Sequence, residues 1–149
     1  MAISRGSGTE IIRSVHLEDV TDTATPLIVG VQHHIYTVLS VIVFNNTIAA
    51  TGTNVMYLQG YDSYGGTTDQ SMYFFIQDTG VANETFVWND KFSFNGFEPV
   101  SFTGPMNTAA EQDAIADQGS SVKQILNIYT SSNSNKIDVH CTYIDQNNA

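Results

Sequence analysis

Four histidines and one cysteine are the residues of this sequence best suited to metal binding or nucleophilic catalysis. His33 and His34 are adjacent, and adjacent residues of a strand point to opposite faces, so a bend must intervene before they could share a metal ion. His140 stands in the same relation to Cys141, and no CxxC or HExxH spacing occurs in the chain. We therefore expect ordinary surface or interface histidines, with no metal site and no bound cofactor.

Other routes to catalysis find equally little support. A nucleophilic Cys141 would need an exposed thiolate and a base, yet it shares the apolar phase of its strand with Val139 and Tyr143, which predicts a buried, inert thiol. No serine lies in a GxSxG elbow, and the paired glycines lack the lysine of a phosphate loop. Acidic pairs such as Glu18-Asp19 lie in polar segments; a glycosidase-like pair distant in sequence stays open, but no pattern selects one. The sequence predicts a non-enzymatic protein with no catalytic residues.

Composition narrows the class of protein further. The 149 residues are the usual size of one domain, and only 13% are charged, with Thr, Ser, Asn and Gly in their place, as in β-rich proteins with many turns. A net charge of −10 repels phosphate backbones, so nucleic acid is not an expected partner. A basic partner surface, or solubility alone, would explain that charge. No secretory signal or membrane span is visible, which predicts a soluble protein made in a cytosol without membrane contact.

Aromatic residues alternate with a period of two over Asn83–Gly96. This stretch carries the only Trp, Trp88, and three of the eight Phe, which predicts one aromatic-rich strand or a pair of strands. Asn89-Asp90 would form a tight turn or a bulge between the two halves. Because each ring buries a large apolar area, we expect this stretch at the centre of the core, with Trp88 buried there.

The run Ile35–Phe44 is apolar on both faces of a regular strand. One phase holds Tyr36, Val38, Ile42 and Phe44, and the other holds Ile35, Leu39, Val41 and Val43. A strand that is apolar on both sides is usually buried on both sides, so its outer face should be covered by another subunit or by the chain's own arm. We therefore expect a homo-oligomer, with a trimer preferred.

Further strands are predicted from alternation or β-branched content over the segments Glu10–Leu17, Leu27–Val31, Asn54–Asp62, Ser71–Gln77, Phe97–Thr103, Val122–Tyr129 and Lys136–Asp145. Glu18–Ala24 is expected to be a loop, and His33-His34 a bend. In the last strand, Ile137, Val139, Cys141 and Tyr143 should share the buried face. Many short strands at this spacing predict an all-β fold, an antiparallel β-sandwich or a jelly-roll-like arrangement.

Two segments interrupt the strand pattern. Residues 108–118 carry a capping box and are rich in Ala, which predicts one short helical insertion. Residues 1–9 are small and polar with two glycines, which predicts a flexible N-terminal arm. The remaining residues, 10–149, are expected to form a single β-sandwich domain.

The interface residues are predicted from the surplus of aromatic side chains and the scarcity of positive charge. Tyr is enriched at protein interfaces, and the arginines of the N-terminal region supply charge that most of the chain lacks. The candidates are Arg5, Arg13, Tyr36, Tyr57, Tyr61 and Tyr64. Sugar binding by exposed aromatic rings is an alternative use of the same tyrosines.

Several short motifs carry a resemblance. The segments are Asp78–Thr85, Trp88–Phe94, Lys136–His140 after Ser132-Asn133, and Tyr143–Asp145. In these segments the chain resembles small β-sandwich structural proteins of tailed bacteriophages, in which a "D-K-[apolar]-x-[apolar]" strand leads to a closing "[apolar]-D-V-x-x-x-Y-I" strand. The match covers the C-terminal half, and Asn107–Gln118 has no place in the compact version of that family.

The resemblance implies a function and a location. It implies a virion protein made in the host cytoplasm, above all a capsid decoration (cement) protein that binds the major capsid protein or other virion proteins. A neck, tail or baseplate accessory is the alternative within that class, and trimers or symmetric rings are the common assemblies. The rival class is a carbohydrate-binding β-sandwich used for attachment to host sugars.

Overall fold

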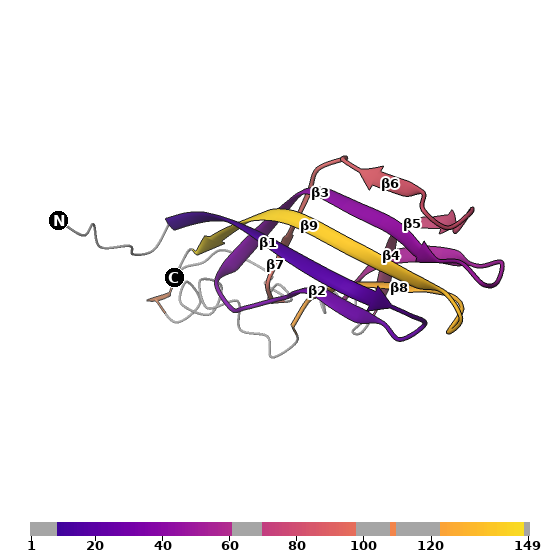
Figure 1. The fold of residues 1–149 in the computed structure, drawn as a ribbon. Coiled ribbons are helices and arrows are strands. Elements are labelled where there is room, and N and C mark those ends of the chain that lie inside the picture. Colours follow the sequence, from indigo (N-terminus) through magenta and orange to yellow (C-terminus); the bar gives the residue numbers. More distant parts are fainter. Residues whose placement is uncertain (1–8, 61–69, 98–107, 110–122, 148–149) are drawn as a thin grey trace.

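The computed structural model describes residues 9–60, 70–97, 108–109 and 123–147, in which nine strands form two packed sheets (Figure 1). The strands are β1 (Thr9–Val20), β2 (Thr25–Val29), β3 (His34–Thr47), β4 (Thr53–Gln59), β5 (Ser71–Asp78), β6 (Thr85–Trp88), β7 (Phe92–Asn95), β8 (Ile125–Thr130) and β9 (Lys136–Asn147).

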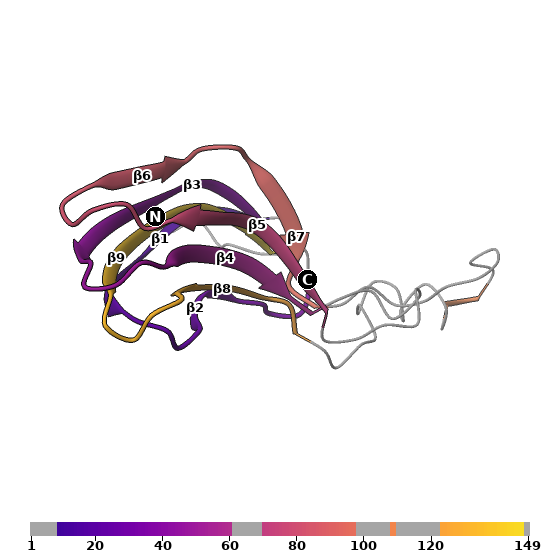
Figure 2. The ribbon, with the colours of Figure 1, turned by 90° about the vertical axis from the view of Figure 1, so that its right-hand side faces the viewer.

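Every strand pairing is antiparallel. The five-stranded sheet has the order β1-β9-β3-β6, with β7 also paired to β3, and the four-stranded sheet has the order β2-β8-β4-β5. Figure 2 shows the strands of both sheets as curved ribbons, with β6 and β3 near the top of the view and β8 and β2 near the bottom. The prediction of an all-β antiparallel sandwich is confirmed. Of the predicted helical insertion over 108–118, only Thr108 and Ala109 lie among the described residues.

The side chains between the sheets follow the alternation of β9 most clearly. Ile137, Val139 and Cys141 are fully buried, as predicted, while their neighbours along the strand are not. They pack with Met56 of β4 and Leu126 of β8 in one hydrophobic cluster. The Cys141 thiol lies in this cluster, and burial raises its pKa to about 12. The predicted burial of this thiol is confirmed.

The long strand β3 departs from the regular alternation that the sequence analysis assumed. Val38 pairs with Tyr143 and Ser40 pairs with Thr142, so Leu39 is an extra residue that forms a β-bulge. The bulge reverses the phase of the strand: Tyr36 and Val38 face the core before it, and Val41 and Val43 face the core after it. The predicted assignment of residues to the two faces is therefore wrong, but the outer face remains apolar, because Ile35, Ile42 and Phe44 lie on the side away from the core.

The aromatic stretch forms an edge of the five-stranded sheet and not its centre. Strands β6 and β7 both pair antiparallel with β3, Trp88 beside Val41 and Phe92 beside Val38, so they are two halves of one interrupted strand. The irregularity predicted at Asn89-Asp90 lies between them. Trp88 is partly buried and contacts Phe75 of the opposite sheet, with ring centroids 5.8 Å apart. The centre of the sheet is instead the pair β3 and β9.

Strand boundaries also differ from the predicted ones. Strand β1 begins at Thr9, which was assigned to the arm, and continues to Val20, so Glu18–Val20 are not part of a loop. Of the predicted strand Phe97–Thr103, only Phe97 is described, in a single bridge to Lys123. Residues 1–8 lie outside the described part of the chain.

Candidate functional site

A charged cluster lies at the end of the sandwich where β1 begins and β9 ends (Figure 1). Asp145 of β9 is buried, and Arg13 on the neighbouring strand places its Nε 2.9 Å from Asp145 Oδ2. His34 of β3 places Nδ1 2.5 Å from Asp145 Oδ1. Because an ionised carboxylate only accepts hydrogen bonds, both neighbours donate to it. We name Arg13, His34 and Asp145 the charged end.

Two tyrosines pack beside the charged end. The Tyr36 hydroxyl accepts a hydrogen bond from the backbone N–H of Val31 at 3.1 Å, and burial together with the nearby Asp145 carboxylate raises the pKa of Tyr36 to about 12. Burial also raises the pKa of Tyr143, whose ring centroid lies 6.0 Å from that of Tyr36. Each Asp145 oxygen already has a protein donor, and the tyrosines are poor acids here. This arrangement joins strands and offers no free catalytic group.

The opposite end of the sandwich is held by uncharged amides. Asn135 Oδ1 accepts from the backbone N–H groups of Ala49 and Ala50 at 2.9 and 3.0 Å, and its Nδ2 donates to the Ala50 carbonyl at 2.9 Å. Asn54 Nδ2 donates to Asn45 Oδ1 at 3.0 Å, and Asn45 Nδ2 donates to the Thr79 carbonyl. Asn45, Asn54 and Asn135 are all buried. We name these three residues the amide end.

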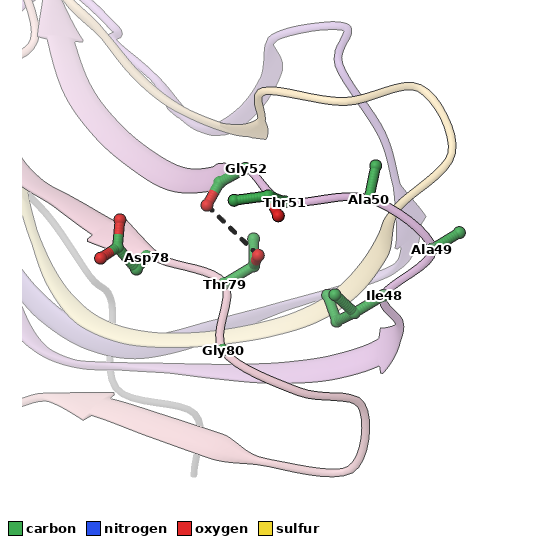
Figure 3. A pocket seen from close by; sticks show the side chains of 8 residues that line it. All are labelled: Ile48, Ala49, Ala50, Thr51, Gly52, Asp78, Thr79 and Gly80. Atoms are coloured by element: carbon green, nitrogen blue, oxygen red, sulfur yellow. Dashed lines mark hydrogen bonds between the residues drawn. The ribbon is translucent and has the colours of Figure 1, made fainter.

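A hollow of about 480 Å³ opens at the amide end (Figure 3). It lies between the β3–β4 connection and the chain that follows β5, where Thr79 Oγ1 donates to the Gly52 carbonyl at 3.2 Å. Its lining residues are Ile48, Ala49, Ala50, Thr51, Gly52, Asp78, Thr79 and Gly80. Among these eight, Asp78 is the only titratable residue, so the hollow has no acid–base pair and no nucleophile with a partnered base.

A second hollow, of about 240 Å³, lies on the outer face of the four-stranded sheet. Tyr57 pairs with Tyr73 across β4 and β5, with ring centroids 5.5 Å apart, and the Tyr129 ring meets Tyr57 edge-on at 5.9 Å. Asp22 and Ala24, from the β1–β2 connection, and Ser71 complete the lining. Burial, followed by the proximity of Tyr73 and Tyr57, raises the pKa of Tyr129. We name the site formed by Tyr57, Tyr73, Tyr129 and Asp22 the tyrosine hollow.

The predicted interface residues do not lie together on one surface. Tyr57 is half-buried and lies in the tyrosine hollow. Tyr36 is buried in the core, so its surface role is wrong, and Arg13 is not a free cation because it is paired with Asp145. Arg5, Tyr61 and Tyr64 lie outside the described residues.

Sequence reasoning missed Tyr73 and Tyr129 as partners of Tyr57. Along β5, Met56 pairs with Phe75 but Tyr57 pairs with Tyr73, so Phe74 is an extra residue that changes the phase of the strand. A regular alternation cannot reveal that Tyr73 and Phe75 point to opposite faces. A search for tyrosines on predicted neighbouring strands would have found Tyr129, once the order β8-β4-β5 was known.

The histidines do not assemble a metal site in the part of the chain that is described. His16 and His140 are cross-strand neighbours with ring centroids 5.6 Å apart, and His16 Nε2 lies 3.6 Å from Glu18 Oε1. Among the described residues, no group of three or more His, Cys, Asp or Glu side chains could hold a metal ion. In the same residues, we find no helix with the length and hydrophobicity needed to cross a bilayer.

Comparisons with known proteins give little to add. No protein-family model matches the chain, and no curated protein matches it significantly. Among solved structures, the chain is similar to one from work titled "Bacillus endospore appendages form a novel family of disulfide-linked pili", with a TM-score of 0.42 and 12% identity. That likeness covers 100% of this chain and 97% of the other. A TM-score of this size supports no conclusion about function.

Proposed function

We propose that this chain is a non-enzymatic structural protein that assembles with other proteins through the outer faces of its sheets. The observation that carries this proposal is the exposure of large apolar side chains on both sheets. Ile12 of the five-stranded sheet is 71% exposed, and Ile76 of the four-stranded sheet is 62% exposed. Val87, Met72 and Tyr73 are also at least half exposed. The exposure of such side chains to water is unfavourable, and covering them with a partner stabilises the assembly.

Several of the charged and polar groups that could do chemistry are occupied inside the described part of the fold. Asp145 is shared by Arg13 and His34, and Cys141 lies in the core. The amide side chains at the other end bond to loop backbone. This distribution is typical of a building block, in which polar side chains fix the shape and apolar ones remain available to neighbours.

Within this class, we propose a virion protein of a tailed bacteriophage, made in the host cytoplasm, and most specifically a capsid decoration protein. The support is the resemblance over Asp78–Thr85, Trp88–Phe94 and the last strand, all of which fall within or beside β5, β6, β7 and β9. The expected partners are further copies of the chain and the major capsid protein. A neck, tail or baseplate position uses the same surfaces and is the alternative within the class.

The deciding experiment is copy number on purified particles. A decoration protein should co-sediment with intact capsids at a stoichiometry that matches the capsid lattice, whereas a neck or tail component should be present in a few copies to a few tens. If the chain were absent from purified particles at either stoichiometry, a virion role would be contradicted.

A trimer is proposed as the free or particle-bound assembly. The bulge in β3 changes which residues form its outer face but leaves that face apolar, with Ile35, Ile42 and Phe44, and this face supports assembly together with the other exposed apolar side chains. Multi-angle light scattering of the isolated protein at micromolar concentration checks it. A stable monomer, both free and at the particle surface, would contradict a trimer.

Carbohydrate binding is kept as a second candidate function because three tyrosines and one carboxylate line the tyrosine hollow. Aromatic faces and carboxylates are both used to hold sugar rings and hydroxyls. Binding to a glycan array, lost on substitution of Tyr73, would favour this function over structural assembly.

A further inference from the structure

The tyrosine hollow differs in composition from the rest of the outer sheet face. Its floor is set by the register of three strands: Tyr57 lies between Asn127 of β8 and Tyr73 of β5, and Tyr129 lies beside Val55 in the adjacent row. Tyr73 is half exposed, while Tyr57 and Tyr129 are partly buried against it. Three aromatic rings therefore converge on one small depression.

The electrostatic potential of this depression is expected to be negative. Among the described residues, Asp22 is its one charged lining residue, exposed on the β1–β2 connection, and no lysine or arginine of that part of the chain lines it. The faces of the three rings carry the negative part of their quadrupole. A tyrosine phenol is neutral at physiological pH, and burial raises the pKa of Tyr129 further, so the ring is an uncharged aromatic wall. A negative carboxylate and three aromatic rings around one hollow, within a chain of net charge −10, form an environment that favours a cation.

The ring geometry favours a compact cation over a sugar. Tyr73 is tilted by 34° to Tyr57, and Tyr129 is nearly perpendicular to it, at 81°. These planes form walls at different angles and not the flat platform on which a pyranose ring stacks. The polar lining is also sparse for a sugar: apart from the phenol hydroxyls, the lining side chains offer only the Asp22 carboxylate and the Ser71 hydroxyl.

We infer that the tyrosine hollow binds a cationic side chain, arginine or lysine, presented by the protein on which this chain assembles. The guanidinium or ammonium group would lie against the tyrosine faces with Asp22 as its counter-ion. That the cation belongs to a partner protein rests on the proposed function, whereas the preference of the hollow for a cation does not.

The experiment uses free small molecules, so that it is independent of any partner. The full chain, labelled with ¹³C in its tyrosine rings, is titrated with N-acetyl-arginine amide and followed by two-dimensional NMR. N-acetyl-citrulline amide is the neutral control of nearly the same shape, and methyl glucoside and methyl galactoside represent neutral sugars. We expect saturable shifts of the Tyr57, Tyr73 and Tyr129 ring signals with an affinity in the range of about 1–10 mM. Citrulline should bind at least about tenfold more weakly, and salt should weaken the arginine response.

Two variants locate the site. Asp22→Asn should weaken arginine binding several-fold, while Asp90→Asn, which removes one exposed carboxylate from the β6–β7 connection, should leave binding unchanged. Tyr73→Leu should abolish the shifts of the two remaining rings without loss of the dispersed methyl signals of the core, because the Tyr73 side chain is half exposed.

The outcomes separate this inference from the proposed function. Equal binding of citrulline and arginine, binding of a sugar alone, or no binding at all would each overturn the cation site. Arginine binding with the expected variant effects would support it even if the chain proved absent from phage particles, and in that case the failure would belong to the proposed function.

Discussion

At the charged end of the sandwich, one buried carboxylate is held by a guanidinium and an imidazole. At the amide end, by contrast, two buried asparagines bond to each other and a third, Asn135, bonds to the backbone of a loop. Both ends join segments that are far apart in the sequence, Arg13 and Asp145 by 132 positions and Ala49 and Asn135 by 86. An amide can donate and accept without carrying a charge out of water, so a neutral network avoids most of the desolvation cost of a buried ion. The difference predicts that the charged end alone should respond to salt and to pH.

The largest expected contrast comes from one glycine at each end. A Cβ on Gly30, near the charged end, would lie 1.8 Å from the carbonyl oxygen of Gly96, which is backbone and cannot turn away. A Cβ on Gly52, at the amide end, would lie 2.7 Å from the Ser131 hydroxyl, which can rotate at the cost of the hydrogen bond that it accepts from the Thr53 N–H. Gly30→Ala should therefore cost about 3 kcal/mol or more of the free energy of unfolding, and Gly52→Ala about 1 kcal/mol. Urea unfolding measures both.

Equal costs for the two glycine variants would mean that the backbone near Gly96 can shift as easily as a serine side chain. The close contact between the β2–β3 and β7 segments would then not be a rigid feature of the charged end.

The next contrast removes one polar side chain from each end. Asp145→Asn leaves Arg13 without its carboxylate, and Asn135→Ala leaves the N–H groups of Ala49 and Ala50 without an acceptor. Each should cost about 1–3 kcal/mol, the value for Asp145 being limited because Arg13 is 48% exposed and partly screened by solvent.

Salt should distinguish these two polar variants. The destabilisation by Asp145→Asn should shrink between 0.05 and about 1 M NaCl as the ion pair is screened, while that of Asn135→Ala should stay constant. Chemical unfolding with urea, which is uncharged, is the appropriate measurement. A salt-dependent Asn135→Ala would contradict the neutral character of the amide end.

Alkaline pH should act on the charged end through Tyr36. The folded pKa of Tyr36 is raised from 10.0 to about 12, so between these values the unfolded chain loses a proton that the folded chain keeps, and stability falls as pH rises. The contribution of Tyr36 to the free energy of unfolding is complete below pH 10 and is lost as pH rises through about 12. Tyr36→Phe should cost about 1 kcal/mol at pH 8, from the lost hydrogen bond to Val31, and should reduce the alkaline loss by up to about 2 kcal/mol. Unfolding measured from pH 8 to 11.5 checks both effects.

Cys141 and Tyr143 also have raised pKa values, so part of the alkaline loss should persist in the Tyr36→Phe variant. Asn135→Ala provides the control, because Asn135 lies at the amide end, away from these groups. In this variant the free energy of unfolding should fall with rising pH as steeply as in the wild type. If the free energy of unfolding of Tyr36→Phe fell with pH as steeply as that of the wild type, the Tyr36 phenol would be hydrated in the folded chain.

Local sequence patterns predicted the strands themselves well. The alternation of Ile137, Val139 and Cys141 placed β9 and its buried face correctly because that strand pairs with β3 without a register shift over these residues. The irregularity at Asn89-Asp90 was visible because both residue types favour turns.

Features that depend on strand pairing could not be predicted in the same way. The bulges at Leu39 and Phe74 involve residues with no special turn preference, and each reverses the phase of its strand. The bulge at Leu39 therefore exchanges the faces of β3: Val38 shares the core face with Val41, and Ile35 shares the outer face with Ile42. The charged end joins residues from three strands, and the tyrosine hollow needs the order β8-β4-β5 and the phase change at Phe74, none of which is encoded locally.

The smallest expected effect concerns residues 1–8, which precede β1 at the charged end. Thr9 already pairs with Asn147, so the pairing of β1 begins without these residues, and their small polar side chains predict little burial. Deletion of residues 1–8 should therefore change the melting temperature by less than about 2 °C, which corresponds to a few tenths of a kcal/mol. The same deletion should weaken attachment to neighbouring subunits, because it removes Arg5, which can supply the positive charge that Arg13, paired with Asp145, does not. Arg5→Gln in the full chain is the matched control: it should reproduce the weaker attachment, measured by retention on particles, with no change in melting temperature. If the deletion instead lowered the melting temperature by several degrees while Arg5→Gln did not, these residues would belong to the packing of the charged end and would not form a free arm.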